Sequence, residues 1–156
     1  MKKFPITKEG YIKLKEELNS LKQVQRPNII NRIVEARAFG DLSENAEYSA
    51  AKEEQSQIEG KILDLESKLG QAEIIDSSKF SGDKIKFGAE IILLDNDTEE
   101  EIKYKIVGEY ESKPENQIIS IKSPLAQILV GKSVGDIVKF NAPKKIKIYE
   151  ILSVKY

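Results

Sequence analysis

The stretch IEGKILDLESKLGQA, residues 58–72, decides the fold because its apolar residues return in steps of four and three. Those residues are Ile58, Ile62, Leu65, Leu69 and Ala72. The spacing puts them on one face of an α-helix and is typical of the seam of a two-stranded coiled coil. Charged and amide side chains fill most of the other positions, as a solvated helix surface requires. This helix therefore needs a partner that covers its apolar face.

The partner lies upstream in the same chain. The same steps of three and four occur at Tyr11, Leu14, Leu18 and Leu21. We expect a first helix over residues 8–38, with Thr7 as its N-cap, and a second helix over residues 44–75. At about 1.5 Å per residue, each helix would be roughly 45 Å long.

The connection between the two helices is short and reads Phe39-Gly40-Asp41-Leu42-Ser43. Gly40 suits a left-handed residue just past a helix end, and Ser43 suits the N-cap of the next helix. A connection of this length makes the two helices antiparallel neighbours. The sequence therefore predicts a long helical hairpin.

Two residues interrupt the helical pattern. Pro27 predicts a kink or a helix in two pieces, because an interior proline costs about 3 kcal/mol. The pattern restarts after it, and we expect Ile30 and Ile33 on the seam. Gly60 costs about 1 kcal/mol in a helix, and a close approach of the two backbones would explain it.

After Asp76 the pattern changes to short strands and turns. Residues 77–83 are rich in Ser, Gly and Asp and predict a linker. Ser123-Pro124 predicts a helix start, with Ser at the N-cap and Pro at the first helical position. We expect an antiparallel sheet with one short helix, formed by strands at 89–95, 102–107, 117–121, 137–140 and 146–154 and a helix at 125–129 that ends at Gly131. The fold class is α+β, with a hairpin over residues 1–76 and a sheet domain over residues 84–156.

Composition excludes several classes of function. The chain has 156 residues, 25 Lys and Arg, 26 Asp and Glu, and neither His nor Cys. A disulfide framework, a thiolate nucleophile, a Ser-His-Asp triad and a His- or Cys-built zinc site are therefore impossible. The net charge of −1 provides no global basic field for nucleic acid. No targeting segment or membrane-spanning run is evident, and we expect a soluble cytoplasmic protein.

Acidic residues gather at the end of the hairpin. Asp41 and Glu44 are three positions apart, so their carboxylates can converge. A capping box uses the same spacing, so helix capping is one interpretation. Two carboxylates are too few for a complete Mg²⁺ shell, so a metal role requires ligands from another molecule.

The end of the hairpin resembles a known family. The run Glu35-Ala36-Arg37, Gly40-Asp41-Leu42-Ser43-Glu44-Asn45-Ala46-Glu47-Tyr48 and Ala50-Ala51-Lys52 is similar to the tip of the GreA/GreB family of bacterial transcription elongation factors. Segments outside the tip resemble the same family: Thr7 to Leu18, Arg26-Pro27, Ile58-Glu59-Gly60, Ser123-Pro124-Leu125-Ala126, Gly131 to Asp136 and Tyr149 to Leu152. The resemblance covers essentially the whole chain.

The resemblance implies a coiled-coil hairpin followed by an FKBP-like domain. It implies binding at the rim of the secondary channel of bacterial RNA polymerase, with the hairpin reaching toward the active site. There a factor of this family stimulates the polymerase's own cleavage of the extruded RNA 3′ end. On this reading the protein is not itself an enzyme, acts as a monomer and has no membrane partner.

The resemblance also assigns roles to residues. Asp41 and Glu44 would help to retain the second Mg²⁺ of the polymerase and orient water, and the isolated protein would bind no cofactor. Leu42 and Ser43 would set the loop geometry or contact the transcript. Arg37 and Lys52 would contact RNA phosphates, although a solvated charge or an intrahelical ion pair is the plainer interpretation.

Other interpretations stay open at this point. For the aromatic residues Phe39 and Tyr48, we favour packing at the hairpin end over stacking on a base. A related factor could occupy the channel without stimulating cleavage, but Asp41-Leu42-Ser43-Glu44 matches the activating pattern. A coiled-coil adaptor or an isomerase would use the tip acids only as caps, and the sequence shows no obvious aromatic-lined pocket for isomerase activity.

Overall fold

The computed structural model describes residues 3–40 and 45–156 and divides them into two units. One unit comprises residues 11–72, and the other joins residues 3–10 to residues 73–156. We expected all of residues 1–76 in the hairpin. The N-terminal residues belong to the second unit because they form a strand that contacts it, as described below.

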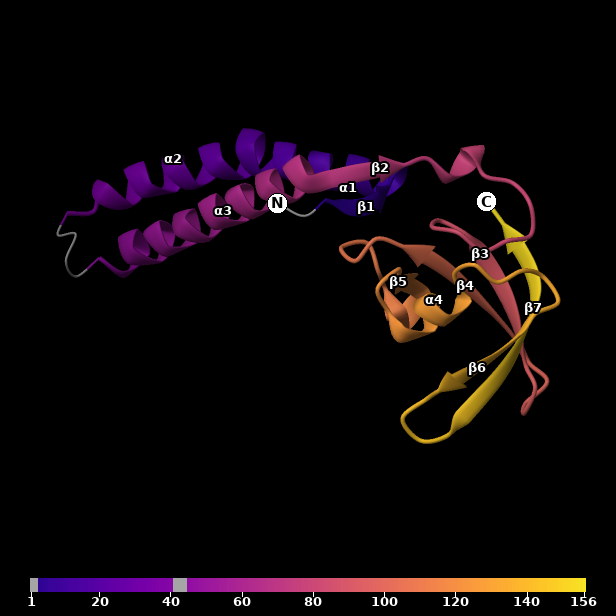
Figure 1. Cartoon of the computed structure of the whole chain (residues 1–156). Coiled ribbons are helices and arrows are strands. Elements are labelled where there is room, and N and C mark those ends of the chain that lie inside the picture. Colours follow the sequence, from indigo (N-terminus) through magenta and orange to yellow (C-terminus); the bar gives the residue numbers. More distant parts are fainter. Residues whose placement is uncertain (1–2, 41–44) are drawn as a thin grey trace. The chain divides into compact units, whose positions relative to one another are not determined.

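The first unit is a helical hairpin, as the sequence predicts. Its first arm contains α1 (Lys8–Ser20), a π-helical turn (Leu21–Gln25) and α2 (Arg26–Arg37). The second arm is α3 (Ala46–Gln71), which lies alongside α2 in Figure 1. Thr7 caps α1 as predicted, because its hydroxyl accepts a hydrogen bond from the Gly10 amide at 3.0 Å.

The first arm is in two α-helical pieces, which confirms the prediction made from Pro27. Proline lacks an amide hydrogen, and the π-helical turn directly precedes α2, in which Pro27 occupies the first turn. A π-helical turn holds more residues than an α-helical one, so it shifts the seam. Ile29 is therefore buried at 2% exposure, whereas Ile30 is 44% exposed. The expectation of Ile30 on the seam was wrong, and that of Ile33 is confirmed.

The seam of the hairpin is an apolar core. Its buried residues are Leu18, Leu21, Ile29, Ile33, Ala51, Ile58, Ile62 and Leu65, with Leu14, Tyr48 and Leu69 packed against them. Ion pairs flank this core. Arg26 bonds Glu59 through two nitrogens, at 2.7 and 2.8 Å, and thereby lowers the pKa of the Glu59 carboxyl. These contacts hold the arms side by side.

Gly60 does not mark a close approach of the two arms. A Cβ placed on it would meet no heavy atom within 4 Å, and the residue is exposed. The expectation of backbone contact was therefore wrong.

We expect Gly60→Ala to stabilise the hairpin by about 0.5–1 kcal/mol, because alanine restricts the unfolded chain and favours the helix. Urea unfolding followed by far-UV circular dichroism measures the change. Gly40→Ala is the control, because Gly40 has a φ of +108° and gains nothing from a side chain. Equal or lower stability of Gly60→Ala would contradict the expectation.

The second unit contains a five-stranded sheet in the order β5-β4-β3-β7-β6. The strands are β3 (Glu90–Asp95), β4 (Glu101–Val107), β5 (Ile118–Ser120), β6 (Ile137–Asn141) and β7 (Ile146–Lys155). The short helix α4 (Pro124–Leu129) starts as predicted, with the Ser123 hydroxyl accepting a hydrogen bond from the Ala126 amide at 3.3 Å. Leu125, Ala126 and Leu129 of this helix belong to the core that covers the sheet.

The sheet is mixed, and the expectation of a fully antiparallel sheet was wrong in one place. β5 pairs with β4 in parallel, from Lys105 opposite Ile118 to Val107 opposite Ser120. The connection over residues 108–117 contains a short 3₁₀ turn and a left-handed residue, Gln117, with a φ of 57°. This connection carries the chain back before β5 begins, so the two strands run in one direction.

A second, two-stranded sheet was not predicted. It pairs β1 (Phe4–Thr7) with β2 (Ala72–Ile75), so α3 ends at Gln71 rather than at residue 75. Glu111 tethers β1 to the rest of the second unit: its carboxylate accepts hydrogen bonds from the Thr7 amide at 3.0 Å, from the Thr7 hydroxyl and from the Gly108 amide at 2.9 Å. These bonds explain why the N-terminal residues group with the sheet domain.

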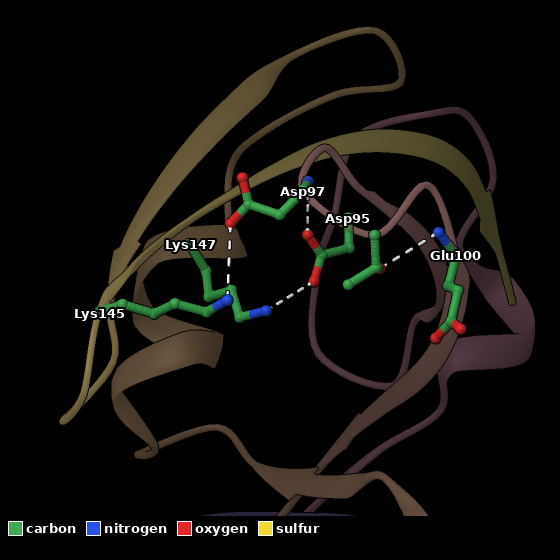
Figure 2. A network of polar contacts seen from close by, with 6 residues as sticks. Asp95, Asp97, Glu100, Lys145 and Lys147 are labelled. Carbon is green, nitrogen blue, oxygen red and sulfur yellow. Dashed lines mark hydrogen bonds and ion pairs between the residues drawn. The ribbon is translucent and has the colours of Figure 1, made fainter.

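A partly buried ion pair lies where β3 meets β7 (Figure 2). Asp95, with its side chain 4% exposed, accepts a hydrogen bond from the Lys147 ammonium at 2.9 Å. It also accepts one from the Asp97 amide at 2.9 Å. The hydrogen bond from Lys147, followed by the one from Asp97, lowers the pKa of the Asp95 carboxyl.

This shift predicts an acid-sensitive sheet domain. Because the folded pKa lies below the unfolded one, the pair stabilises above about pH 4 and the contribution is lost as pH falls through the folded pKa. We expect the melting temperature of the wild type to fall toward that of Asp95→Asn below about pH 4. Asp97→Asn is the control, since the Asp97 side chain is 51% exposed and lies 4.0 Å from Lys145. If the melting temperatures of wild type and Asp95→Asn change with pH in parallel, the stabilising role assigned to ionised Asp95 is contradicted.

Candidate functional site

The candidate site lies at the end of the hairpin where α2 stops and α3 starts. α2 ends at Arg37, and Gly40 follows with a φ of +108°, which confirms the left-handed residue predicted there. The predicted site residues Asp41, Leu42, Ser43 and Glu44 lie outside the described residues. The described part of the site is therefore the pair of helix ends from which this segment departs.

The N-cap of α3 is Asn45, so the expectation of Ser43 was wrong. The Asn45 side-chain oxygen accepts a hydrogen bond from the Tyr48 amide at 3.0 Å, and its backbone is extended. Asparagine and serine are about equally strong N-caps, so N-cap preference does not distinguish Asn45 from Ser43 in the sequence. The side-chain nitrogen of Asn45 also donates to the Ala36 carbonyl at 2.6 Å, which no sequence pattern indicated.

The position of this cap bears on the two interpretations of the tip acids. A capping box of α3 would use Asn45 at the N-cap and Tyr48 three residues later. Asp41 and Glu44 both precede this N-cap in the sequence. The capping-box interpretation therefore does not account for these two acids in α3.

Arg37 and Lys52 lie on different helices and are both exposed. Lys52 donates to the Gln55 side chain at 3.1 Å, and among the described residues it has no carboxylate partner. Arg37 likewise makes no ion pair within the described ranges. By contrast, Arg26 and Arg32 are paired with Glu59 and Glu54 on α3. The intrahelical ion pair expected as the plainer role of Lys52 is thus not formed with the glutamates near it that the structure describes.

The two aromatic residues near the tip differ. Tyr48 packs against the hairpin core, as predicted. Phe39 is 75% exposed, so its predicted packing was wrong. Phe39 lies beyond the last residue of α2, so helical spacing no longer places it on the face that carries the buried residues of that helix. It borders a hollow of about 310 Å³ that is also lined by Arg32, Glu35, Ala36, Glu47, Ala50 and Ala51.

The described part of the chain offers no complete metal centre. Within residues 3–40 and 45–156, no group of three or more Asp, Glu, His or Cys side chains is placed to hold a metal ion. None of the helices in these ranges combines the length and the apolar character that a membrane span needs.

Sequence models of one family match both parts of the chain. The model described as "Transcription elongation factor, N-terminal" matches residues 4–74. The model described as "Transcription elongation factor, GreA/GreB, C-term" matches residues 80–156.

Two near full-length relatives agree with this match. Transcription elongation factor GreA of Rickettsia prowazekii is 56% identical over 154 residues, which cover 99% of this chain and 95% of that protein. GreA of Phenylobacterium zucineum is 52% identical over 156 residues, which cover 100% and 99%. Among solved structures, GreA factor homolog 1 of Thermus thermophilus has a TM-score of 0.45 at 25% identity and covers 99% of this chain and 100% of its own. The family models and the near full-length relatives together show that this chain belongs to the GreA/GreB family of transcription elongation factors.

Proposed function

We propose that this protein stimulates the cleavage of backtracked RNA by bacterial RNA polymerase. Its hairpin enters the secondary channel, where the extruded RNA 3′ end lies, and its sheet domain docks at the channel rim. The polymerase performs the cleavage, and this protein acts as a monomeric helper in the cytoplasm. Elongation resumes from the new 3′ end.

The observation that carries this proposal is the capping of α3 by Asn45. In the sequence, Asp41 and Glu44 come after the last residue of α2 and before the N-cap of α3, so a capping box of α3 does not include them. Two carboxylates are enough to complete a metal site that another protein builds but not to build one alone. A helical hairpin that carries acids at its end suits the delivery of carboxylates into a narrow channel.

In this proposal Asp41 and Glu44 help to retain the second Mg²⁺ in the polymerase active site and orient the attacking water. The bound Mg²⁺ ions supply an activated water and a stabilised leaving oxygen. One tip carboxylate also accepts the proton of the water. Leu42 and Ser43 set the loop geometry or contact the transcript.

Arg37 and Lys52 bind RNA phosphates in this proposal. Both are exposed, and among the described residues neither is paired with a carboxylate. Phosphate contacts of this kind orient a nucleic acid without reading its sequence.

The test uses stalled, backtracked complexes of bacterial RNA polymerase with Mg²⁺. We expect the protein to bind in the secondary channel, measured by competition binding to the polymerase. We also expect it to accelerate shortening of the RNA from its 3′ end. Binding without acceleration would overturn the proposal in favour of a factor that blocks the channel. Failure to bind would place the protein outside this function altogether.

A further inference from the structure

One side chain joins the two arms of the hairpin at their tip ends. The Asn45 amide nitrogen donates to the Ala36 carbonyl at 2.6 Å, and its oxygen accepts from the Tyr48 amide at 3.0 Å. Ala36 is 4% exposed and lies in the last turn of α2, nine positions before Asn45. This is the hydrogen bond between the arms that lies nearest to the tip in the described sequence.

Each of these bonds serves a backbone group at a helix end. The last carbonyls of a helix and its first amides lack partners within the helix. The Ala36 carbonyl accepts from the Phe39 amide at 3.2 Å and also from the Asn45 side chain at 2.6 Å. The Tyr48 amide is one of the first amides of α3. Asn45 therefore caps the end of one helix and the start of the next at the same time.

This double role requires an amide of this length. Asparagine carries both a donor and an acceptor, whereas an ionised aspartate carries acceptors only and a serine has a single, shorter oxygen. The two partners also fix the orientation of the amide, because Tyr48 offers a hydrogen and Ala36 offers an oxygen. Aspartate or serine could replace Asn45 as an N-cap but not as the link to α2.

We propose that Asn45 is a positioning residue for the stimulated cleavage. By holding the end of α2 against the start of α3, it fixes the distance between the two helix ends that residues 41–44 connect in the sequence. This inference rests on the proposed function. Ala36, whose carbonyl Asn45 holds, is itself buried at 4% exposure, so the link joins Asn45 to a buried position of α2.

The experiment separates the link from the cap. Asn45→Asp and Asn45→Ser keep an acceptor for the Tyr48 amide and lose the donor to Ala36, whereas Asn45→Ala loses both. Cleavage of backtracked RNA is measured over a range of Mg²⁺ concentrations, beside binding to polymerase and helix content. Asn28→Asp, an exposed asparagine on α2, is the control for the added charge.

We expect Asn45→Asp and Asn45→Ser to bind polymerase as the wild type does. Their cleavage at low Mg²⁺ should fall about 10- to 100-fold and recover partly at high Mg²⁺, as when partners that orient metal ligands are removed. If both variants cleave RNA at the wild-type rate at every Mg²⁺ concentration, the inference is overturned. Losses that merely follow helix content or binding would also overturn it. If the wild type itself fails to stimulate cleavage, the proposed function fails instead, which is a distinguishable result.

Discussion

Asp41→Asn and Glu44→Gln should each bind RNA polymerase like the wild type and lose about a hundredfold or more of the stimulated cleavage. The substitutions keep the size of each side chain and remove the negative charge that would attract Mg²⁺ and accept a proton. Positioned acids and bases contribute about 10²- to 10⁴-fold to proton transfer steps, which sets the expected scale. The measurement is the rate of RNA shortening in backtracked complexes at a saturating concentration of each variant.

A matched control separates chemistry from folding. Glu47→Gln removes one carboxylate from the exposed first turn of α3 and should leave cleavage unchanged. Retained cleavage in both tip variants, with melting temperatures lowered, would show that the acids only support the loop. The position of Asn45 argues against that result, because the cap of α3 is already supplied by another residue.

The hairpin could be predicted because its signals are local and repeated. Leu18, Leu21, Ile58, Ile62 and Leu65 are all buried, as their spacing indicates. The strands and the short helix of the second unit also lie close to the predicted ranges, because turn residues separate them clearly. Gly131 and Gly135, for example, have φ values of +89° and +93°, the first just after α4 and the second in the turn before β6.

The errors arise where regular α-helical or strand periodicity does not decide the local structure. Ile29 replaces Ile30 on the seam because a π-helical turn precedes Pro27, and helical spacing counted at an α-helical period misses that shift. β1 and β2 form because Phe4–Thr7 and Ala72–Ile75 meet in the fold, although nearly seventy positions separate them. The link from Asn45 to Ala36 likewise depends on the closure of the hairpin.

The candidate site was predicted less completely than the fold. The acids and basic residues were proposed from their order along the chain, which the resemblance made specific, and their roles stay predictions. The exposure of Phe39 and the double role of Asn45 depend on where helices stop, and helix ends are the least certain part of a sequence pattern. Their discovery therefore required the structure.

Gly108→Ala should destabilise the second unit by about 2–3 kcal/mol, the upper range for overpacking a closed site. A Cβ on Gly108 would lie 2.4 Å from the Pro5 carbonyl oxygen and 2.8 Å from a carboxylate oxygen of Glu111. The Pro5 carbonyl oxygen belongs to the backbone of β1, so it cannot move out of the way by a side-chain rotation. The variant must therefore move β1 or break the hydrogen bonds that Glu111 accepts from Thr7 and Gly108.

Gly10→Ala provides the comparison that isolates the backbone clash. Its Cβ would lie 2.1 Å from a Glu111 carboxylate oxygen, and its three nearest atoms all belong to that side chain. Glu111→Ala removes the side chain that the Gly10 Cβ would meet, so it should reduce the loss of stability caused by Gly10→Ala. It should not reduce the loss caused by Gly108→Ala, because the Pro5 carbonyl remains. Calorimetric unfolding of the two double variants, each set against Glu111→Ala alone, measures this difference. If Glu111→Ala reduced the loss of stability equally for both glycine variants, β1 would be free to move and Glu111 alone would exclude a side chain at both positions.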